Sequence, residues 1–127
     1  MINFAQDSLF KLHRVNDGDV NKDAVKMFTD DEALVGVYAT VRDQVIFTTK
    51  RVITIDVAGI TGKKKDFCSF PYKHIQFYAV QTAGFAELIP DSELMLVMAN
   101  GTKVVFEFKG ANDIIAIGRA ISKYALD

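Results

Sequence analysis

The stretch GITGKKK, which begins at Gly59, places two glycines and a threonine beside three lysines. Glycines that let the backbone approach a phosphate, followed by a lysine, are the chemistry of a phosphate-binding loop. That loop needs four residues between its glycines and Ser or Thr after its lysine. Here two residues separate Gly59 from Gly62, and another lysine follows Lys63. The stretch also lies between two expected strands, so no helix N-terminus stands behind it to favour an anion. A nucleotide site is therefore not expected.

Basic residues concentrate around this stretch. The segment 42–73 carries seven basic and three acidic residues, whereas the whole chain has a net charge of −1. Turns tolerate solvated lysines, and the same lysines can also make weak contact with an anion or an acidic partner; both interpretations stay open. The near-neutral charge gives no general attraction to nucleic acid, which is not expected as a partner. The candidate contacts are Lys50, Arg51, Lys63, Lys64, Lys65 and Lys73.

A calcium-loop pattern begins at Asp17 but is not completed. Asp17 and Asp19 are spaced as in an EF-hand, yet Lys22 stands where the sharp turn requires glycine, and Phe28 stands where a bidentate glutamate is required. Calcium binding is not expected there.

The nucleophilic and metal-ligating residues are few and scattered. His13 and His74 belong to no nucleophile signature, and one cysteine with two distant histidines makes a poor zinc site. Cys68 lies between apolar neighbours in an expected strand, where a small buried residue is the usual interpretation. We therefore expect no catalytic site, no cofactor, no metal and no enzyme activity.

The N-terminal sequence lacks the basic start and apolar stretch of a secretion signal. No apolar run reaches the roughly 18–20 residues that cross a bilayer. The single cysteine excludes an internal disulfide framework. These features favour a soluble cytoplasmic protein.

The expected secondary structure that would position these residues changes from helix to strand at Leu34. Before it, apolar residues at helical spacing predict a helix, with Asp17 or Asp19 as its cap and a shorter helix over 4–12. After it, alternating patterns predict seven strands. The helical positions are Val20, Ala24, Met27 and Phe28, and the strand segments are LVGVYATV, VIFTT, VITIDV, DFCSF, QFYAVQTA, ELMLVMA and TKVVFEFK.

Three details of the strands and the C-terminus follow from the pattern. VITIDV alternates as a half-buried strand does. Asn100-Gly101 predicts a type I′ hairpin. An apolar stripe of Ile114, Ile117 and Ile121 predicts a final helix. The side chain of Asn112 or Asp113 would accept hydrogen bonds from the first free N–H groups of this helix.

These elements predict a mainly β (α+β) fold. Seven short strands bend into two packed sheets or a partly open barrel, and the C-terminal helix covers the open side. We expect an N-terminal helical extension over residues 1–31 and the β domain over residues 32–127.

Two neighbouring expected strands, QFYAVQTA and ELMLVMA, are apolar on both faces. This pattern predicts that their outer surface is covered. The N-terminal helices or another copy of the chain would cover it, and open strand edges invite pairing between copies. The residues expected at such a self-association interface are Phe77, Tyr78, Met95 and Val97.

Several features of residues 48–75 recur in one order that resembles bacterial pleckstrin-homology (PH) domains. Phe70 stands where that pattern more often has an aliphatic residue. The resemblance extends over residues 32–126 and implies a seven-stranded bent sheet with a C-terminal helix, and homo-oligomeric rings rather than catalysis. The matching residues are Thr49-Lys50-Arg51, Asp56, Gly59, Gly62-Lys63-Lys64 and Phe70-Pro71-Tyr72-Lys73.

The expected function is therefore a non-enzymatic interaction or scaffolding module that forms homo-oligomers. The alternative is a module that weakly binds anionic lipid or phosphate, with a membrane surface or an acidic protein as partner. Eukaryotic PH domains that bind inositol phosphates mainly use the loop between their first two strands. Here that connection, Arg42-Asp43-Gln44, is far too short to form a headgroup cradle, so a specific phosphoinositide site is not expected.

Overall fold

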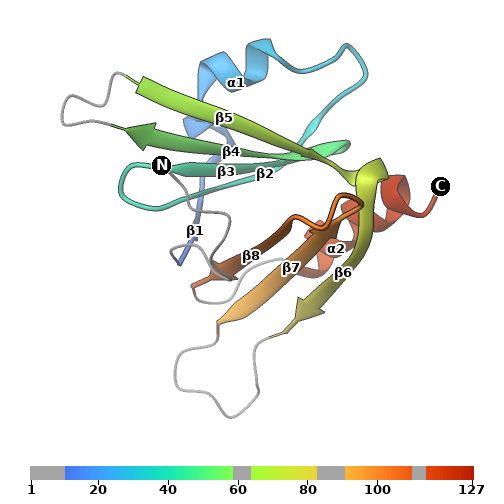
Figure 1. The fold of residues 1–127 in the computed structure, drawn as a ribbon. Coiled ribbons are helices and arrows are strands. Elements are labelled where there is room, and N and C mark those ends of the chain that lie inside the picture. The colour runs from blue at the N-terminus through green and yellow to red at the C-terminus, as the bar shows by residue number, and fades with distance from the viewer. Residues whose placement is uncertain (1–10, 59–63, 83–90, 110–113) are drawn as a thin grey trace.

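The computed structural model describes residues 11–58, 64–82, 91–109 and 114–127, which form eight strands in two antiparallel sheets and a C-terminal helix (Figure 1). One sheet has the order β1-β2-β3-β4-β5 and the other the order β6-β7-β8. The elements are β1 His13–Val15, η1 Asp17–Asp19, α1 Lys22–Lys26, β2 Leu34–Ala39, β3 Gln44–Thr48, β4 Arg51–Ala58, β5 Lys64–Pro71, η2 Tyr72–His74, β6 Ile75–Gln81, β7 Ser92–Met98, β8 Lys103–Phe108 and α2 Ile114–Ala125.

The mainly β class and the covering C-terminal helix are confirmed, but the strand count of seven is wrong by one. The additional strand, β1, lies in the segment that was expected to be helical, and Arg14 pairs with Tyr38 of β2. A free sheet edge leaves backbone hydrogen-bonding groups without partners, so pairing with β2 outweighs the local helical pattern. The two sheets do not close into a barrel. The domain boundary expected after residue 31 stays a prediction.

The helix expected over residues 20–28 is shortened to α1. Its cap is Asn21 rather than Asp17 or Asp19, because the Asn21 side-chain oxygen accepts hydrogen bonds from the N–H groups of Asp23 and Ala24. Both aspartates lie in η1 instead. The helix expected over residues 4–12 falls mainly outside the described residues, and Leu12 at its end forms a parallel bridge with Phe108.

The main core fills the space between the sheets. It is rich in aromatic rings, and Tyr38 meets Phe108 edge-to-face with a centroid distance of 4.8 Å. Helix α2 closes one side of this core with its apolar stripe, in which Ile117 is 2% exposed. The chain passes from one sheet to the other through η2, next to α2 (Figure 1).

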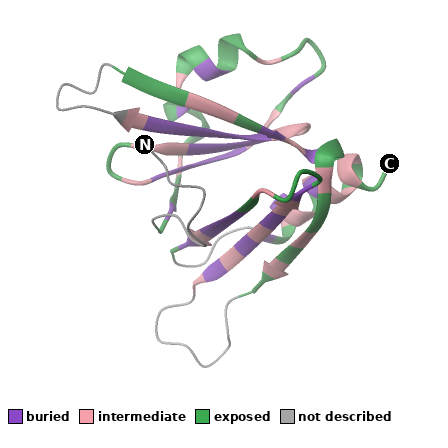
Figure 2. Cartoon of the chain, viewed as in Figure 1, coloured by how far each residue is buried: buried purple, intermediate pink, exposed green. Residues whose placement is uncertain are grey.

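A second core lies on the outer face of the five-stranded sheet. Ala24 of α1 is fully buried there, among Val37, Ile46 and Ile53. Strand β4 is consequently buried on both faces from Val52 to Asp56, which Figure 2 shows as an uninterrupted buried run. The expectation of a half-buried strand is wrong, because the N-terminal segment packs over the face that would have met water.

The β7–β8 hairpin also differs from the expected type I′ turn. That turn needs positive φ at both central residues, and among the described residues only Gly101, with φ +91°, has it. The Gly101 N–H donates to the Met98 carbonyl, and the Met98 N–H donates to Thr102. The loop therefore has three residues and ends in a left-handed glycine.

Candidate functional site

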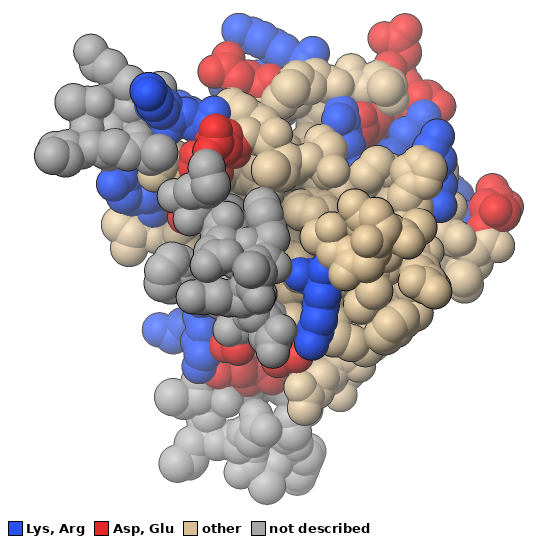
Figure 3. All heavy atoms as spheres, in the orientation of Figure 1, with Lys and Arg blue, Asp and Glu red and all other residues tan. Residues whose placement is uncertain are grey.

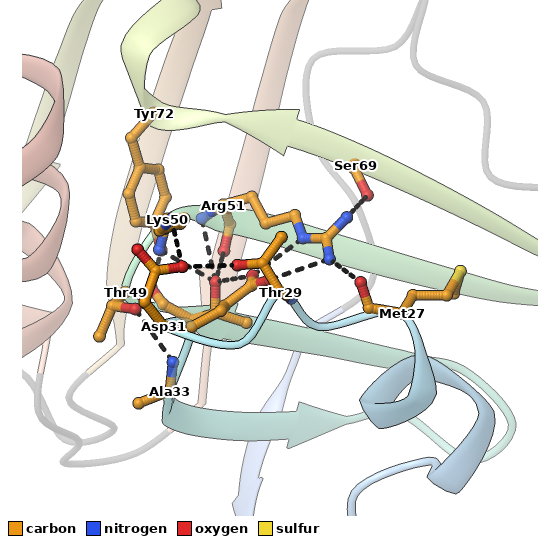
Figure 4. A network of polar contacts seen from close by, with 11 residues as sticks. Met27, Thr29, Asp31, Ala33, Thr49, Lys50, Arg51, Ser69 and Tyr72 are labelled. Carbon is orange, nitrogen blue, oxygen red and sulfur yellow. Dashed lines mark hydrogen bonds and ion pairs between the residues drawn. The ribbon is translucent and has the colours of Figure 1, made fainter.

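Arg51, one of the predicted anion contacts, is committed to an ion pair inside the protein. Its guanidinium donates to both carboxylate oxygens of Glu32, at 2.9 and 3.0 Å, and also to the carbonyl of Met27 and the hydroxyl of Ser69 (Figure 4). The Glu32 side chain is 1% exposed. The pair ties the segment between α1 and β2 to the β3–β4 turn.

The same carboxylate accepts two further hydrogen bonds. The Thr48 hydroxyl donates at 2.5 Å and the Thr29 N–H at 3.1 Å. Burial alone opposes ionisation, but the hydrogen bonds from Arg51, Thr48 and Thr29 outweigh it and hold the pKa of Glu32 below its ordinary value. Tyr72, whose pKa burial raises, donates from its hydroxyl to the Thr48 carbonyl. This cluster stabilises the turn and leaves Arg51 little capacity to bind a ligand.

Lys50 is also paired. Its ammonium lies 2.7 Å from the Asp31 carboxylate, and this hydrogen bond lowers the pKa of Asp31 and raises that of Lys50. Lys73 is exposed and lines a groove of about 490 Å³ together with Lys50, Arg51 and Tyr124. Of the three predicted cations at this end of the sheet, only Lys73 forms no ion pair within the described part of the chain.

Lys64 and Lys65 lie at the opposite end of the sheet, at the start of β5. Both side chains are exposed. Lys63 lies outside the described residues, as do the glycines of the GITGKKK stretch. The predicted cations are thus divided between two ends of the sheet rather than gathered in one site. The expectation that the GITGKKK stretch is not a specific headgroup site stays a prediction.

The predicted interface residues divide between the two faces of the three-stranded sheet. Phe77 pairs with Val97 and Ala79 with Met95, which puts Phe77, Met95 and Val97 together on the outer face. Tyr78 points the other way, packs against the main core, and its hydroxyl lies 2.6 Å from that of Ser122 in α2. Its assignment to the outer surface is therefore wrong, because adjacent strand residues face opposite sides.

The outer face over β6 and β7 lacks cover by the N-terminal helix, which packs on the other sheet. Phe77 is 51% exposed, and Met95 and Val97 are partly exposed. Figure 3 shows an uncharged surface at its lower right, where β6 lies, bordered by charged side chains over β7. β6 is also an edge strand, since β7 is its only partner among the described strands.

A third feature escaped the sequence interpretation. A cavity of about 720 Å³ lies between the start of β1, the β2–β3 turn and the end of β8, and its lining includes Lys11, His13, Arg42 and Lys109. These residues come from three segments that are far apart in the sequence. Only the pairing of β1 with β2 and of Leu12 with β8 brings them together.

Comparison with known proteins decides the family. The family model described as "Bacterial PH domain" matches residues 3–125. The chain belongs to the bacterial PH domain family. Among curated proteins, this PH domain is 33% identical over 103 residues to the uncharacterized protein YjqA of Bacillus subtilis (strain 168), covering 81% of this chain and 82% of YjqA.

Solved structures agree with this assignment to the bacterial PH domains. A DUF1696 family protein with a pleckstrin-homology domain from Shewanella loihica PV-4 is 34% identical, with a TM-score of 0.73, covering 91% of this chain and 97% of that one. A pleckstrin homology domain from Shewanella amazonensis SB2B is 38% identical, with a TM-score of 0.62, covering 89% and 90%. The family resemblance drawn from the sequence is confirmed.

The described residues contain neither a membrane-spanning helix nor a metal-binding group of side chains. None of their helices has the length and apolar character of a membrane span. No three histidine, cysteine or acidic side chains among them are grouped so that they could hold a metal ion.

Proposed function

We propose that this bacterial PH domain is a non-enzymatic interaction module that assembles with copies of itself through the outer face of β6 and β7. The observation that carries the proposal is the apolar surface of Phe77, Met95 and Val97 beside the β6 edge. Exposed apolar surface of this kind favours association, because burying it removes it from water.

A second copy is the occupant that fits both properties of this surface. An edge strand offers a row of backbone N–H and C=O groups, and an identical strand can supply the complementary row. Because the outer face and the edge are adjacent on one strand, the same contact can bury Phe77 and pair the backbone. Repetition of such a contact around a rotation axis closes a ring. We therefore propose a cyclic homo-oligomer.

Sedimentation velocity at micromolar concentration tests the assembly. We expect a mass above that of the monomer for the unmodified protein, and a shift toward the monomer for Phe77→Lys or Met95→Lys, since each places a charge on the contact. The matched control is Val25→Lys in α1, which adds the same charge at an exposed apolar position, 39% exposed, on the other sheet. A clean monomer for the unmodified protein would refute the proposal.

A further inference from the structure

A groove of about 490 Å³ lies where four parts of the chain meet: the segment before β2, the β3–β4 turn, η2 and the end of α2. Figure 1 shows this end of the molecule on the right, beside the C-terminus. The walls of the groove include Asp31, Lys50, Pro71, Lys73 and Tyr124. None of the described lining residues belongs to β6 or β7, so the groove is separate from the surface proposed for self-association.

The walls of this groove are held in place by hydrogen bonds and by the core. The Tyr72 N–H donates to the Lys50 carbonyl at 2.9 Å, and the Tyr72 hydroxyl donates to the Thr48 carbonyl at 2.8 Å. These two bonds join η2 to the β3–β4 turn. Tyr124, on α2, is partly buried and packs against the main core. The groove therefore exists before a ligand binds, which limits the ordering that binding has to impose.

Two lysines beside the groove have no ion-pair partner within the described part of the chain. Lys73 is exposed in η2, and Lys123 is exposed on α2 with its ammonium 5.6 Å from the centre of the Tyr124 ring. The other two cations of the lining, Lys50 and Arg51, already have carboxylate partners. The groove thus carries positive charge that the described residues do not neutralise.

The remaining groups of the groove distinguish between kinds of ligand. The Asp31 carboxylate is 75% exposed and lies 2.7 Å from the Lys50 ammonium (Figure 4). A phosphate dianion offers only acceptors and would be repelled by this carboxylate. A polypeptide offers carboxylate side chains to the lysines and backbone N–H donors to Asp31. Pro71 and Tyr124 add apolar surface, which a neighbouring apolar side chain can cover.

We propose that this groove binds an acidic segment of another protein. Lys73 and Lys123 contact the carboxylates of the segment, and an apolar side chain next to them packs on Pro71 and Tyr124. Pairs between exposed charges contribute more to the association rate and to specificity than to affinity. Because salt screens such charges, binding weakens as the ionic strength rises.

Selection from a phage-displayed library of short random peptides, on the immobilised protein, tests the proposal without knowledge of the natural partner. We expect enrichment of peptides that carry acidic residues next to an apolar one. Fluorescence anisotropy with a synthesised selected peptide then measures the dissociation constant. Lys73→Gln or Lys123→Gln should each weaken binding about two- to fivefold, the effect of one exposed ion pair. Both side chains are exposed, and circular dichroism checks that the variants fold.

The matched control is the double variant Lys64→Gln, Lys65→Gln, which removes two exposed cations at the opposite end of the five-stranded sheet. We expect a loss below about twofold for this control and of about tenfold for Lys73→Gln with Lys123→Gln. An equal loss in the two double variants would overturn the proposal, since binding would then follow net charge alone.

The selection and a membrane assay supply the other refuting outcomes. Selected peptides without acidic residues, or a library that yields no binding peptide, would overturn the proposal. Co-sedimentation with phosphatidylcholine vesicles, with and without phosphatidylglycerol, is the membrane arm. Binding to the anionic vesicles that depends on Lys73 and Lys123, with peptide binding that does not, would assign the groove to a lipid surface instead.

Discussion

Replacing Arg51 by methionine tests the buried ion pair at the β3–β4 turn. The change keeps the aliphatic stem but removes both hydrogen bonds to the Glu32 carboxylate and those to Met27 and Ser69. Breaking a buried pair by removing one partner costs about 3–5 kcal/mol, because the other charge stays desolvated. The Arg51 side chain is 20% exposed, so water relieves part of this cost. We expect the free energy of unfolding to fall by about 3 kcal/mol at pH 7.

The cost should depend on pH with a definite sign. In the unmodified protein the folded-state pKa of Glu32 is lowered, so the pair's contribution is complete above the unfolded pKa and is lost as the pH falls through the folded pKa. Without Arg51, burial should raise the folded-state pKa of Glu32. The variant then loses stability as the pH rises, and the difference between the two proteins should shrink between pH 7 and pH 4.

Urea denaturation at the two pH values measures both effects. Adding Glu32→Gln to Arg51→Met should restore part of the stability at pH 7, since a neutral amide needs no counter-charge. Lys50→Met is the matched control, because its partner Asp31 is 75% exposed and little stability should be lost. A loss below about 0.5 kcal/mol for Arg51→Met, or a loss equal at both pH values, would refute the reasoning.

The remaining predictions concern single contacts. Tyr72→Phe should lower the unfolding free energy by about 1–2 kcal/mol, because it leaves the buried Thr48 carbonyl without its 2.8 Å partner; thermal denaturation measures the loss. Gly101→Ala should cost about 1–2 kcal/mol in the same assay, because φ of +91° is strained for any side chain with a Cβ. Asn21→Ala should cost about 1 kcal/mol through loss of the α1 cap, whereas Asn21→Asp should cost little. Cys68, packed against the core, should react slowly with a thiol reagent in the native protein, and rapid modification would contradict a structural role.

The sequence by itself determined much of the β architecture. Strands such as LVGVYATV and TKVVFEFK carry an alternation of period two that only a strand can use to divide its side chains between two faces, and the stripe of Ile114, Ile117 and Ile121 has a period that only a helix can use. The order of turn residues after Thr49 was specific enough to indicate the bacterial PH domain family. These signals are local, so they can be interpreted without knowing what packs against each element.

Tertiary structure decided which faces are covered and which charges meet. The sequence predicted a helical N-terminal segment from the apolar spacing that begins at Val20. In the structure His13–Val15 forms a strand that pairs with β2, because this pairing gives hydrogen-bond partners to the backbone groups at the sheet edge. The sequence indicated that Arg51 is a surface cation. In the structure Arg51 pairs with the buried carboxylate of Glu32, nineteen residues earlier in the chain.

The cavity at the β2–β3 turn shows the same limit most clearly. Lys11, Arg42 and Lys109 share no segment of sequence, and only the pairing of β1 with β2 and of Leu12 with β8 brings them around one cavity. A local pattern records the period of one element, whereas a site made from three segments depends on register and topology. Register and topology are fixed by burial of the whole core, and for that reason only the folded structure reveals the site.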